Sequence, residues 1–301
     1  MYLIDSIKII HSFWSKPAFG ANRDIEKYDG GWLHPKYHWM SWALSCLSFR
    51  EKYDQVELVT DRRGKHLLVD TLKLPYTKIT VELDGLNHYP EQLWAIGKLY
   101  AYQIQDAPFI HVDGDVYVWG RFGQDIENAE LIGQHLDIEE GHYYHSLQHL
   151  ERNNIQLLEE FKNDFSSRKR FDSSNAGIIG GNNIDFFKDY VDRAFHFINS
   201  NLDRINKNVN GSSFAMIYEQ YLFSVMARNT GIDIKHLIQE KEENIMHLSD
   251  FFNRFGPLKF VHLLSRAKSM MECYGELELQ LLCDYPDYYN RICSLFNDNA
   301  N

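Results

Sequence analysis

The chain has 301 residues, 44% of them hydrophobic and 14% aromatic, which favours a folded protein with a large core over a disordered one. Its formal net charge of −11 argues against a general polyanion binder, so we expect no nucleic-acid partner. A phosphate ligand is still compatible with this charge, because a metal ion can neutralise phosphate locally.

The cysteines and the apolar runs indicate the compartment. None of the four cysteines forms a C-x-x-C pair, so we expect reduced thiols in place of a zinc or disulfide framework. The N-terminus, residues 1–10, is typical of a first strand and not of a signal peptide. No apolar run approaches the roughly 18 residues of a membrane helix. We therefore expect a cytoplasmic protein without a transmembrane segment.

Strands and helices alternate along the first part of the chain. The patterns predict strands at 6–13, 56–60, 78–83 and 109–112, and helices at 35–53, 65–74 and 91–105. This alternation is typical of a mostly parallel, doubly wound α/β sheet flanked by helices.

The second part of the chain is predicted to hold more helix than strand. Helices are expected within 154–170 and at 184–199 and 214–229, strands at 131–134, 232–237 and 259–262, and a helical pair from 270 that Pro286 interrupts. A short strand is also expected before Gly180 and Gly181, where we predict close backbone approach. His142, His145 and His149 share a helix face, which we interpret as a surface helix in preference to a metal cluster.

The acidic triplet Asp113-Gly114-Asp115 follows the apolar strand 109–112 directly. Ligands of open α/β sheets bind at the carboxyl ends of strands, and carboxylates suit hard cations such as Mg²⁺ and Mn²⁺. The triplet therefore predicts a metal site. The alternative is a hairpin, because Asp-Gly between β-formers is a strong turn signal.

Five short motifs follow one another in an order that resembles the GT-A fold of nucleotide-sugar glycosyltransferases. The similarity is to the family that contains glycogenin and the bacterial lipopolysaccharide galactosyltransferases. The motifs are Lys98, Asp113-Gly114-Asp115, Asn175-Ala176-Gly177-Ile178-Ile179, Glu219-Gln220, and His262 to Lys268. Two positions depart from the family pattern, since Ser265 replaces a Gly and Glu219 replaces the more usual Asp.

This resemblance implies a single GT-A-like domain over residues 1–301. It would consist of a nucleotide-binding half at 1–125, an acceptor and metal half at 126–268 and a helical tail at 269–301. It further implies a metal-dependent hexosyl transfer from a nucleotide-sugar, with a UDP-sugar favoured, to a glycan or lipid-linked acceptor in polysaccharide biosynthesis.

The resemblance also implies roles for individual residues. Asp113, Asp115 and His262 would bind Mn²⁺ or Mg²⁺, with Asp113 also near the donor, and Lys268 and Arg266 would bind the diphosphate. Lys98, Ser12 and Trp14 would contact the nucleotide-sugar. Asn175, Glu219 and Gln220 would serve catalysis, and either Glu219 or Asp172 would be the base of an inverting reaction.

Two other functions stay open at this point. A non-catalytic protein of the same fold could bind a sugar nucleotide or a glycan without turnover. A metal-dependent phosphohydrolase could use Asp113 as its nucleophile. That enzyme class usually carries a Thr or Val four residues after the nucleophile, where this chain has Tyr117.

Overall fold

The computed structural model describes six stretches of the chain: residues 7–19, 28–137, 141–167, 171–205, 208–239 and 245–297. The chain divides into two compact units, and each unit combines separated segments. Unit 1 comprises Met1–Asn87, Val112–Phe122 and Asn244–Asn301. Unit 2 comprises His88–His111 and Gly123–Glu243. The predicted halves at 1–125 and 126–268 and the tail at 269–301 stay a prediction.

Unit 1 contains a parallel sheet with β2 in the middle. Its strands are β1 (Lys8–Phe13), β2 (Val56–Thr60) and β3 (Lys78–Val81), with Ile10 opposite Glu57 and Leu58 opposite Ile79. All five residues of β2 are buried. Buried apolar runs of this kind are typical of parallel strands that are covered on both faces.

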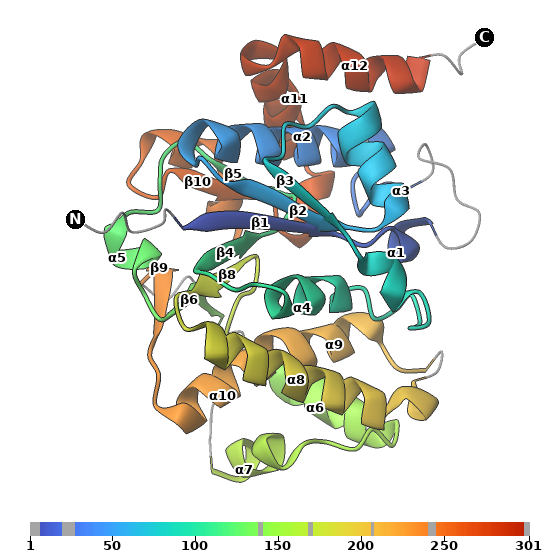
Figure 1. Ribbon diagram of the computed structural model, residues 1–301, viewed down its shortest axis with the longest axis vertical. Helices are drawn as coiled ribbons and strands as arrows, with labels where there is room; N and C mark the ends of the chain where they lie inside the picture. The colour runs from blue at the N-terminus through green and yellow to red at the C-terminus, as the bar shows by residue number, and fades with distance from the viewer. Residues whose placement is uncertain are drawn as a thin grey trace. The chain divides into compact units, whose positions relative to one another are not determined.

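The long helix α2 (Pro35–Lys52) packs on β2 of this sheet, as Figure 1 shows. Pro35 stands in its first turn, and the His34 side chain caps it by accepting a hydrogen bond from the Lys36 backbone N–H. The tail helices α11 (Met271–Asp284) and α12 (Pro286–Asn297) pack against α2. The predicted helical tail is therefore confirmed.

The remaining helical elements of unit 1 are short. They are α1 (Ser15–Phe19), α3 (Arg62–Lys65), a π-helical turn His66–Thr71, and 3₁₀ turns at Leu83–Leu86, Ile245–Ser249, Phe251–Phe255 and Ser265–Ser269. The helix expected at 65–74 thus begins earlier, at Arg62, where Asp61 caps it by accepting from the Gly64 N–H.

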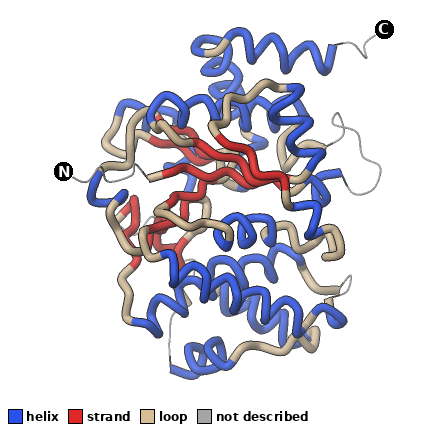
Figure 2. Tube along the Cα trace, viewed as in Figure 1, coloured by secondary structure: helices blue, strands red, loops and turns tan. Residues whose placement is uncertain are grey.

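Unit 2 has its own strands, which Figure 2 shows in red. Their order is β4-β8-β6-β7, and β9 also pairs with β6. The bounds are β4 (Phe109–Val112), β6 (Leu131–Asp137), β7 (Ser173–Ser174), β8 (Ile178–Gly181) and β9 (Ile234–Ile238). The β6–β9 pair is parallel, and β6 runs antiparallel to β7 and β8.

Two glycines allow close contact in unit 2. A Cβ on Gly180 would lie 2.1 Å from the Phe109 carbonyl oxygen. Gly181 adopts φ +147°, and a Cβ there would lie 2.0 Å from the Glu130 carbonyl oxygen. Neither position accepts a side chain without backbone movement, which confirms the predicted close approach.

The helices of unit 2 surround a core of buried aromatic rings, among them Tyr102, Phe187, Tyr190 and Phe223. They are α4 (Ile96–Gln103), α5 (Gln124–Glu127), α6 (His142–Arg152), α7 (Glu159–Ser167), α8 (Ile184–Ser200), α9 (Gly211–Met216), α10 (Leu222–Thr230), a 3₁₀ turn Leu202–Arg204 and a π-helical turn Ile217–Tyr221. Asn183 caps α8 by accepting from the Phe186 N–H. The helix expected from residue 91 begins only at Ile96, because residues 91–95 form turns.

These elements confirm the predicted α/β class, with a mostly parallel sheet flanked by helices. All four cysteines are free thiols. Among the described residues, no helix has both the length and the hydrophobicity that a membrane crossing requires.

Candidate functional site

The acidic triplet lies in unit 1 beside the segment that carries His262. Its following strand β5 (Val116–Val118) pairs antiparallel with β10 (Phe260–His262), with Val116 opposite His262. The Leu263 N–H then donates to the Asp115 carbonyl at 3.0 Å. The hairpin interpretation is therefore wrong, because the partner of β5 comes from near the end of the chain.

Three serines of α2 hold the backbone of this loop. Ser41 Oγ donates to the Gly114 carbonyl at 2.8 Å, and Ser45 Oγ donates to the Asp113 carbonyl at 3.4 Å. Ser48 Oγ accepts from the Val118 N–H at 3.2 Å. These serines share one helix face because they are three or four residues apart. We did not predict this role, although their regular spacing in an otherwise apolar helix was a usable signal.

The glycine between the two aspartates is required by packing. A Cβ on Gly114 would lie 2.5 Å from the ring of Trp42, which is buried on α2. Any side chain here would displace either the indole or the loop. The Asp-Gly-Asp sequence thus sets two carboxylates on a loop that fits closely against α2.

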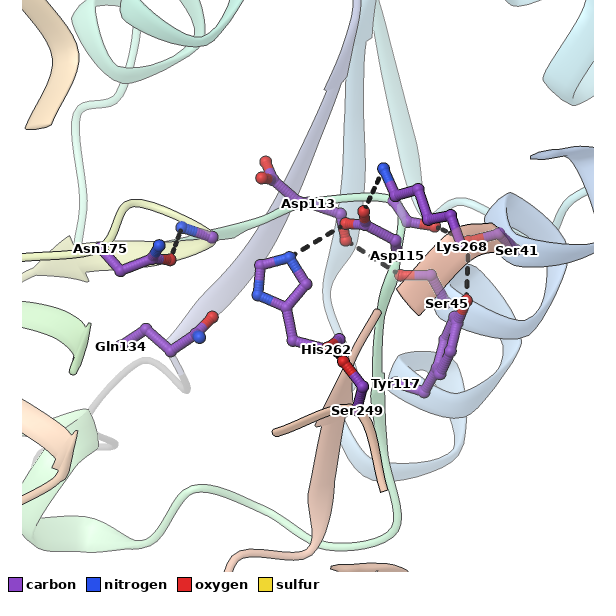
Figure 3. Close-up of polar contacts among 12 residues, drawn as sticks. Ser41, Ser45, Asp113, Asp115, Tyr117, Gln134, Asn175, Ser249, His262 and Lys268 are labelled. Carbon is purple, nitrogen blue, oxygen red and sulfur yellow. Dashed lines mark hydrogen bonds and ion pairs between the residues drawn. The ribbon is translucent and has the colours of Figure 1, made fainter. Parts of the chain in front are cut away.

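Asp113, Asp115 and His262 form a compact group of possible metal ligands (Figure 3). One donor atom from each lies within 4.8 Å of the others. His262 Nε2 lies 3.3 Å from Asp115 Oδ1, and the Ser249 hydroxyl donates to the His262 carbonyl at 2.8 Å. Two carboxylates and one imidazole form a donor set that suits Mn²⁺ or Mg²⁺.

Lys268 completes the charge pattern of this cluster. Its Nζ lies 2.7 Å from Asp115 Oδ2 and 6.0 Å from the centroid of the Trp32 ring. Burial alone would raise the pKa of Asp115, but the charges of Lys268 and His262 outweigh it and hold this pKa well below its usual value. Burial likewise opposes the charged Lys268, yet the Asp115 and Asp113 carboxylates raise its pKa. Both groups of the pair are therefore charged at neutral pH.

The turn that carries Lys268 also carries the other predicted diphosphate ligand. Arg266 is exposed on the 3₁₀ turn Ser265–Ser269. Ser265 has φ +46°, in the left-handed region that favours glycine. The position where the resembling family carries Gly therefore has a glycine-like backbone in this chain also.

Lys98 and Glu219 meet in unit 2, where Lys98 Nζ lies 2.9 Å from Glu219 Oε1. Lys98 belongs to α4, and Glu219 belongs to the π-helical turn Ile217–Tyr221. The Glu219 side chain is 1% exposed and that of Lys98 is 12% exposed. Such π-turns inside α-helices are frequent at functional sites.

The other predicted catalytic residues have local partners in unit 2. Gln220 Oε1 accepts from the Tyr143 hydroxyl at 2.8 Å, and Asn175 Oδ1 accepts from the Gly177 N–H at 2.9 Å. Asp172 lines a cavity of about 320 Å³. Their catalytic roles stay predictions.

Ser12 and Trp14, predicted to lie near the nucleotide, belong to unit 1. Ser12 is half-buried on β1, whereas Trp14 is buried and its Nε1 donates to Asn87 Oδ1 at 3.0 Å. The structure gives Trp14 a packing role, and its contact with a base stays a prediction.

The histidines of α6 have other partners. His142 Nε2 lies 2.9 Å from Met216 Sδ, and His149 Nε2 accepts from the Asn210 N–H at 3.0 Å. Within the described part of the chain, the Asp113, Asp115 and His262 cluster is the group found to have metal-ligand geometry. His142 and His145 are exposed and His149 is half-buried, as expected for a surface helix.

Solved structures of glycosyltransferases resemble this chain at low sequence identity. Mouse xyloside xylosyltransferase 1 is 12% identical with a TM-score of 0.42, over 85% of this chain and 96% of that one. The galactosyltransferase LgtC, solved with donor and acceptor sugar analogues, is 10% identical with a TM-score of 0.46, over 95% and 100%. The glycosyltransferase GlyE of Streptococcus pneumoniae TIGR4 is 10% identical with a TM-score of 0.43, over 98% of this chain but only 65% of GlyE.

All three are glycosyltransferases by name. None of the curated proteins compared with this sequence matches it. A family model does match, over residues 7–295. The chain therefore belongs to the family of unknown function DUF6734.

Proposed function

We propose that this member of the family is a metal-dependent glycosyltransferase, which moves a sugar from a nucleotide-sugar to a hydroxyl of a glycan or lipid-linked acceptor. The observation that carries the proposal is the cluster of unit 1. Two carboxylates from the middle of the chain meet an imidazole and an ammonium from near its end. This arrangement suits a ligand that combines a divalent cation with a diphosphate.

Asp113, Asp115 and His262 would hold Mn²⁺ or Mg²⁺. When bound, the metal would stabilise the negative charge that develops on the leaving diphosphate. The serines of α2 keep the Asp113-Gly114-Asp115 loop in place, so its carboxylates need little rearrangement to bind a cation. Lys268, paired with Asp115 at 2.7 Å, supplies a cation that a diphosphate can share, and Arg266 adds a second one on the same turn.

The proposal assigns the sugar and acceptor contacts to residues of unit 2. Lys98 pairs directly with the buried Glu219, with Lys98 Nζ 2.9 Å from Glu219 Oε1. Glu219 and Gln220 are adjacent on the π-helical turn, and Asn175 is fixed by its own turn. Either Glu219 or Asp172 would accept the proton of the acceptor hydroxyl if the reaction inverts configuration.

The first test is a thermal-shift titration with UDP, GDP and CDP, each with and without Mn²⁺. We expect UDP to stabilise the wild type only when metal is present, because the diphosphate would bind through the cation. Asp115→Asn should lose this stabilisation. Asp54→Asn, which removes an exposed carboxylate of the same unit, should keep it. If no nucleotide stabilises the protein with or without Mn²⁺, the assignment of the site is wrong.

Turnover separates the proposal from its two alternatives. Release of UDP from a panel of UDP-sugars, with or without acceptor, would support the transferase. Binding without any release would indicate a non-catalytic sugar-nucleotide protein. A beryllium fluoride adduct on Asp113 that Asp113→Asn abolishes would indicate a phosphohydrolase instead.

A further inference from the structure

The helix α11 carries an exposed apolar face in unit 1. Met271, Leu279 and Leu282 are 69%, 53% and 41% exposed. They share one side of the helix with Gly275, since these four positions are spaced by three or four residues. Cys273, Leu277 and Leu281 are buried on another side, and α11 packs against α2. We call the side with Met271, Gly275, Leu279 and Leu282 the outer face of α11.

Among the described residues, no steric contact requires the glycine at position 275. A Cβ at this position would meet no atom within 4 Å. Glycine in the middle of a helix costs about 1 kcal/mol relative to alanine. A glycine in the centre of an apolar face, where no described residue requires it, would let a helix of another molecule approach the backbone closely.

A cavity of about 470 Å³ adjoins this helix. Its lining includes the apolar residues Phe252 and Met270 and four charged ones, of which three are acidic: Asp250, Arg254, Glu272 and Glu276. Phe252 is itself 78% exposed, and Phe255 in the same 3₁₀ turn is 74% exposed. Exposed apolar side chains beside a cavity with a charged rim are typical of an interaction site, and the cavity can accept a large side chain as an anchor.

The negative charge of α11 indicates which kind of partner can bind its outer face. The helix contains Glu272, Glu276, Glu278 and Asp284 and no Lys or Arg. Glu278 is paired with Lys36 at 3.0 Å. The negative charge of α11 beside the cavity therefore comes from Glu272 and Glu276. A second copy of the chain would place like charges opposite one another, and an anionic membrane surface would be repelled. A basic partner is the complementary one.

We propose that the outer face of α11 and the adjoining cavity bind a basic amphipathic helix of another protein. This partner would place its apolar side on Met271, Leu279 and Leu282, cross α11 close to Gly275, and insert one large apolar residue into the cavity. Its Lys and Arg side chains would face the carboxylates of α11. This binding surface is independent of the proposed transferase activity.

Fluorescence anisotropy with synthetic peptides tests this proposal on the full chain. The probe is a labelled helix of about four turns with Leu on one side and Lys elsewhere. Two matched controls are a peptide of the same composition in scrambled order and one with Glu in place of Lys. We expect the first peptide to bind and the two controls to fail, because the surface requires both an apolar side and positive charge.

Protein variants locate the binding. Leu279→Ser/Leu282→Ser should weaken binding by at least about tenfold, whereas Leu33→Ser, which changes an exposed leucine elsewhere in unit 1, should not. Gly275→Ala should raise the melting temperature and yet weaken binding, a combination that a merely structural glycine would not give.

Three results would overturn the proposal. Equal binding of the scrambled peptide would show general attraction to an acidic protein. Unchanged binding to Leu279→Ser/Leu282→Ser would place the contact elsewhere. Binding to phosphatidylglycerol vesicles, or dimers that this double variant abolishes, would assign the face to a membrane or to a second copy.

Discussion

Asp115 in unit 1 and Glu219 in unit 2 are both paired with a lysine, but the two pairs differ in what they permit. Asp115 uses one oxygen for His262 and the other for Lys268, and its side chain is 13% exposed. Glu219 is almost fully buried between two helical segments, with Lys98 as its partner. Asp115 can therefore exchange one cationic partner for another when a cation arrives, whereas the pairing of Glu219 with Lys98 lies almost wholly out of solvent. The comparison separates a carboxylate that solvent reaches from one that is buried with its lysine.

The largest effect should come from breaking the pair in unit 2. We expect Lys98→Met to lower the free energy of unfolding by about 3–5 kcal/mol, because it removes the lysine that pairs with the buried Glu219 carboxylate. Urea unfolding measures this change. The double variant Lys98→Met/Glu219→Gln should recover most of the loss. A cost below about 1 kcal/mol for Lys98→Met would contradict the difference between the pairs.

Acid should destabilise the structure behind the Asp-Gly-Asp loop. His11 Nε2 hydrogen-bonds the Ser45 hydroxyl at 2.9 Å, and burial lowers the pKa of His11 to about 3. The unfolded chain binds this proton near pH 6.5 and the folded chain does not. The contribution of His11 to stability is therefore complete above pH 6.5 and falls by about 1.4 kcal/mol per pH unit as the pH drops toward 3.

Unfolding free energies of the wild type and His11→Gln between pH 7 and 5 measure this slope. The variant should show a flatter dependence on pH, whatever its stability at pH 7. Parallel slopes for the two proteins would assign the acid sensitivity to other groups.

The glycine of the triplet should tolerate no side chain. Gly114→Ala is expected to cost about 1–3 kcal/mol, because its Cβ would clash with the Trp42 ring. Gly85→Ala is the matched control, since a Cβ at Gly85 meets no atom within 4 Å. Denaturant unfolding compares the two variants, and equal costs would show that the loop adapts easily.

The smallest effect should be a gain in metal affinity when Lys268, the lysine paired with Asp115, is removed. Lys268→Met should raise the affinity for Mn²⁺ roughly tenfold, because a positive charge no longer competes for Asp115. The same variant should weaken the stabilisation by UDP with Mn²⁺. Calorimetric titration with Mn²⁺ measures the first effect, and Lys65→Met, which changes an exposed lysine of unit 1, is its control. A weaker affinity for Mn²⁺ in Lys268→Met would mean that Lys268 supports the ligands and does not compete with the cation.

The sequence predicted best those strands and helices that are marked by local signals. The strand at 56–60 and the helix from Pro35 have the expected bounds within a residue, because apolar runs and a proline in the first turn are local signals. The start of α4 was missed, since the proline at position 90 is followed by turns and not by the helix it favours. The turn signal at Asp113-Gly114-Asp115 was correct, since the Val116 N–H donates to the Asp113 carbonyl at 3.1 Å. The hairpin alternative was wrong, because the pairing of β5 with β10 is a long-range choice that dipeptide preferences do not contain.

In the candidate site, too, contacts between distant parts of the chain were harder to predict than local features. The order of motifs predicted that Asp115, His262 and Lys268 belong to one cluster, and their distances bear this out. It did not predict that Lys98 pairs with Glu219, because charge pairing across a π-helical turn depends on where helices meet. The serines of α2 were missed for a related reason. A serine in a helix has no visible partner until the loop it binds has been placed.

Unit 1 combines segments that lie far apart in the chain, and this has a consequence for how it folds during synthesis. Its sheet and α2 come from the first part of the chain, whereas His262, Lys268 and the tail helices come from the last. A growing chain on the ribosome therefore contains Asp113 and Asp115 before the segment 262–268, which pairs with Asp115, has been synthesised. Two aspartates this close in sequence repel one another, and closing so long a loop is entropically costly. Divalent cations captured by the nascent loop would relieve that repulsion, so metal supply should affect the folding yield of newly made protein as well as any later catalysis.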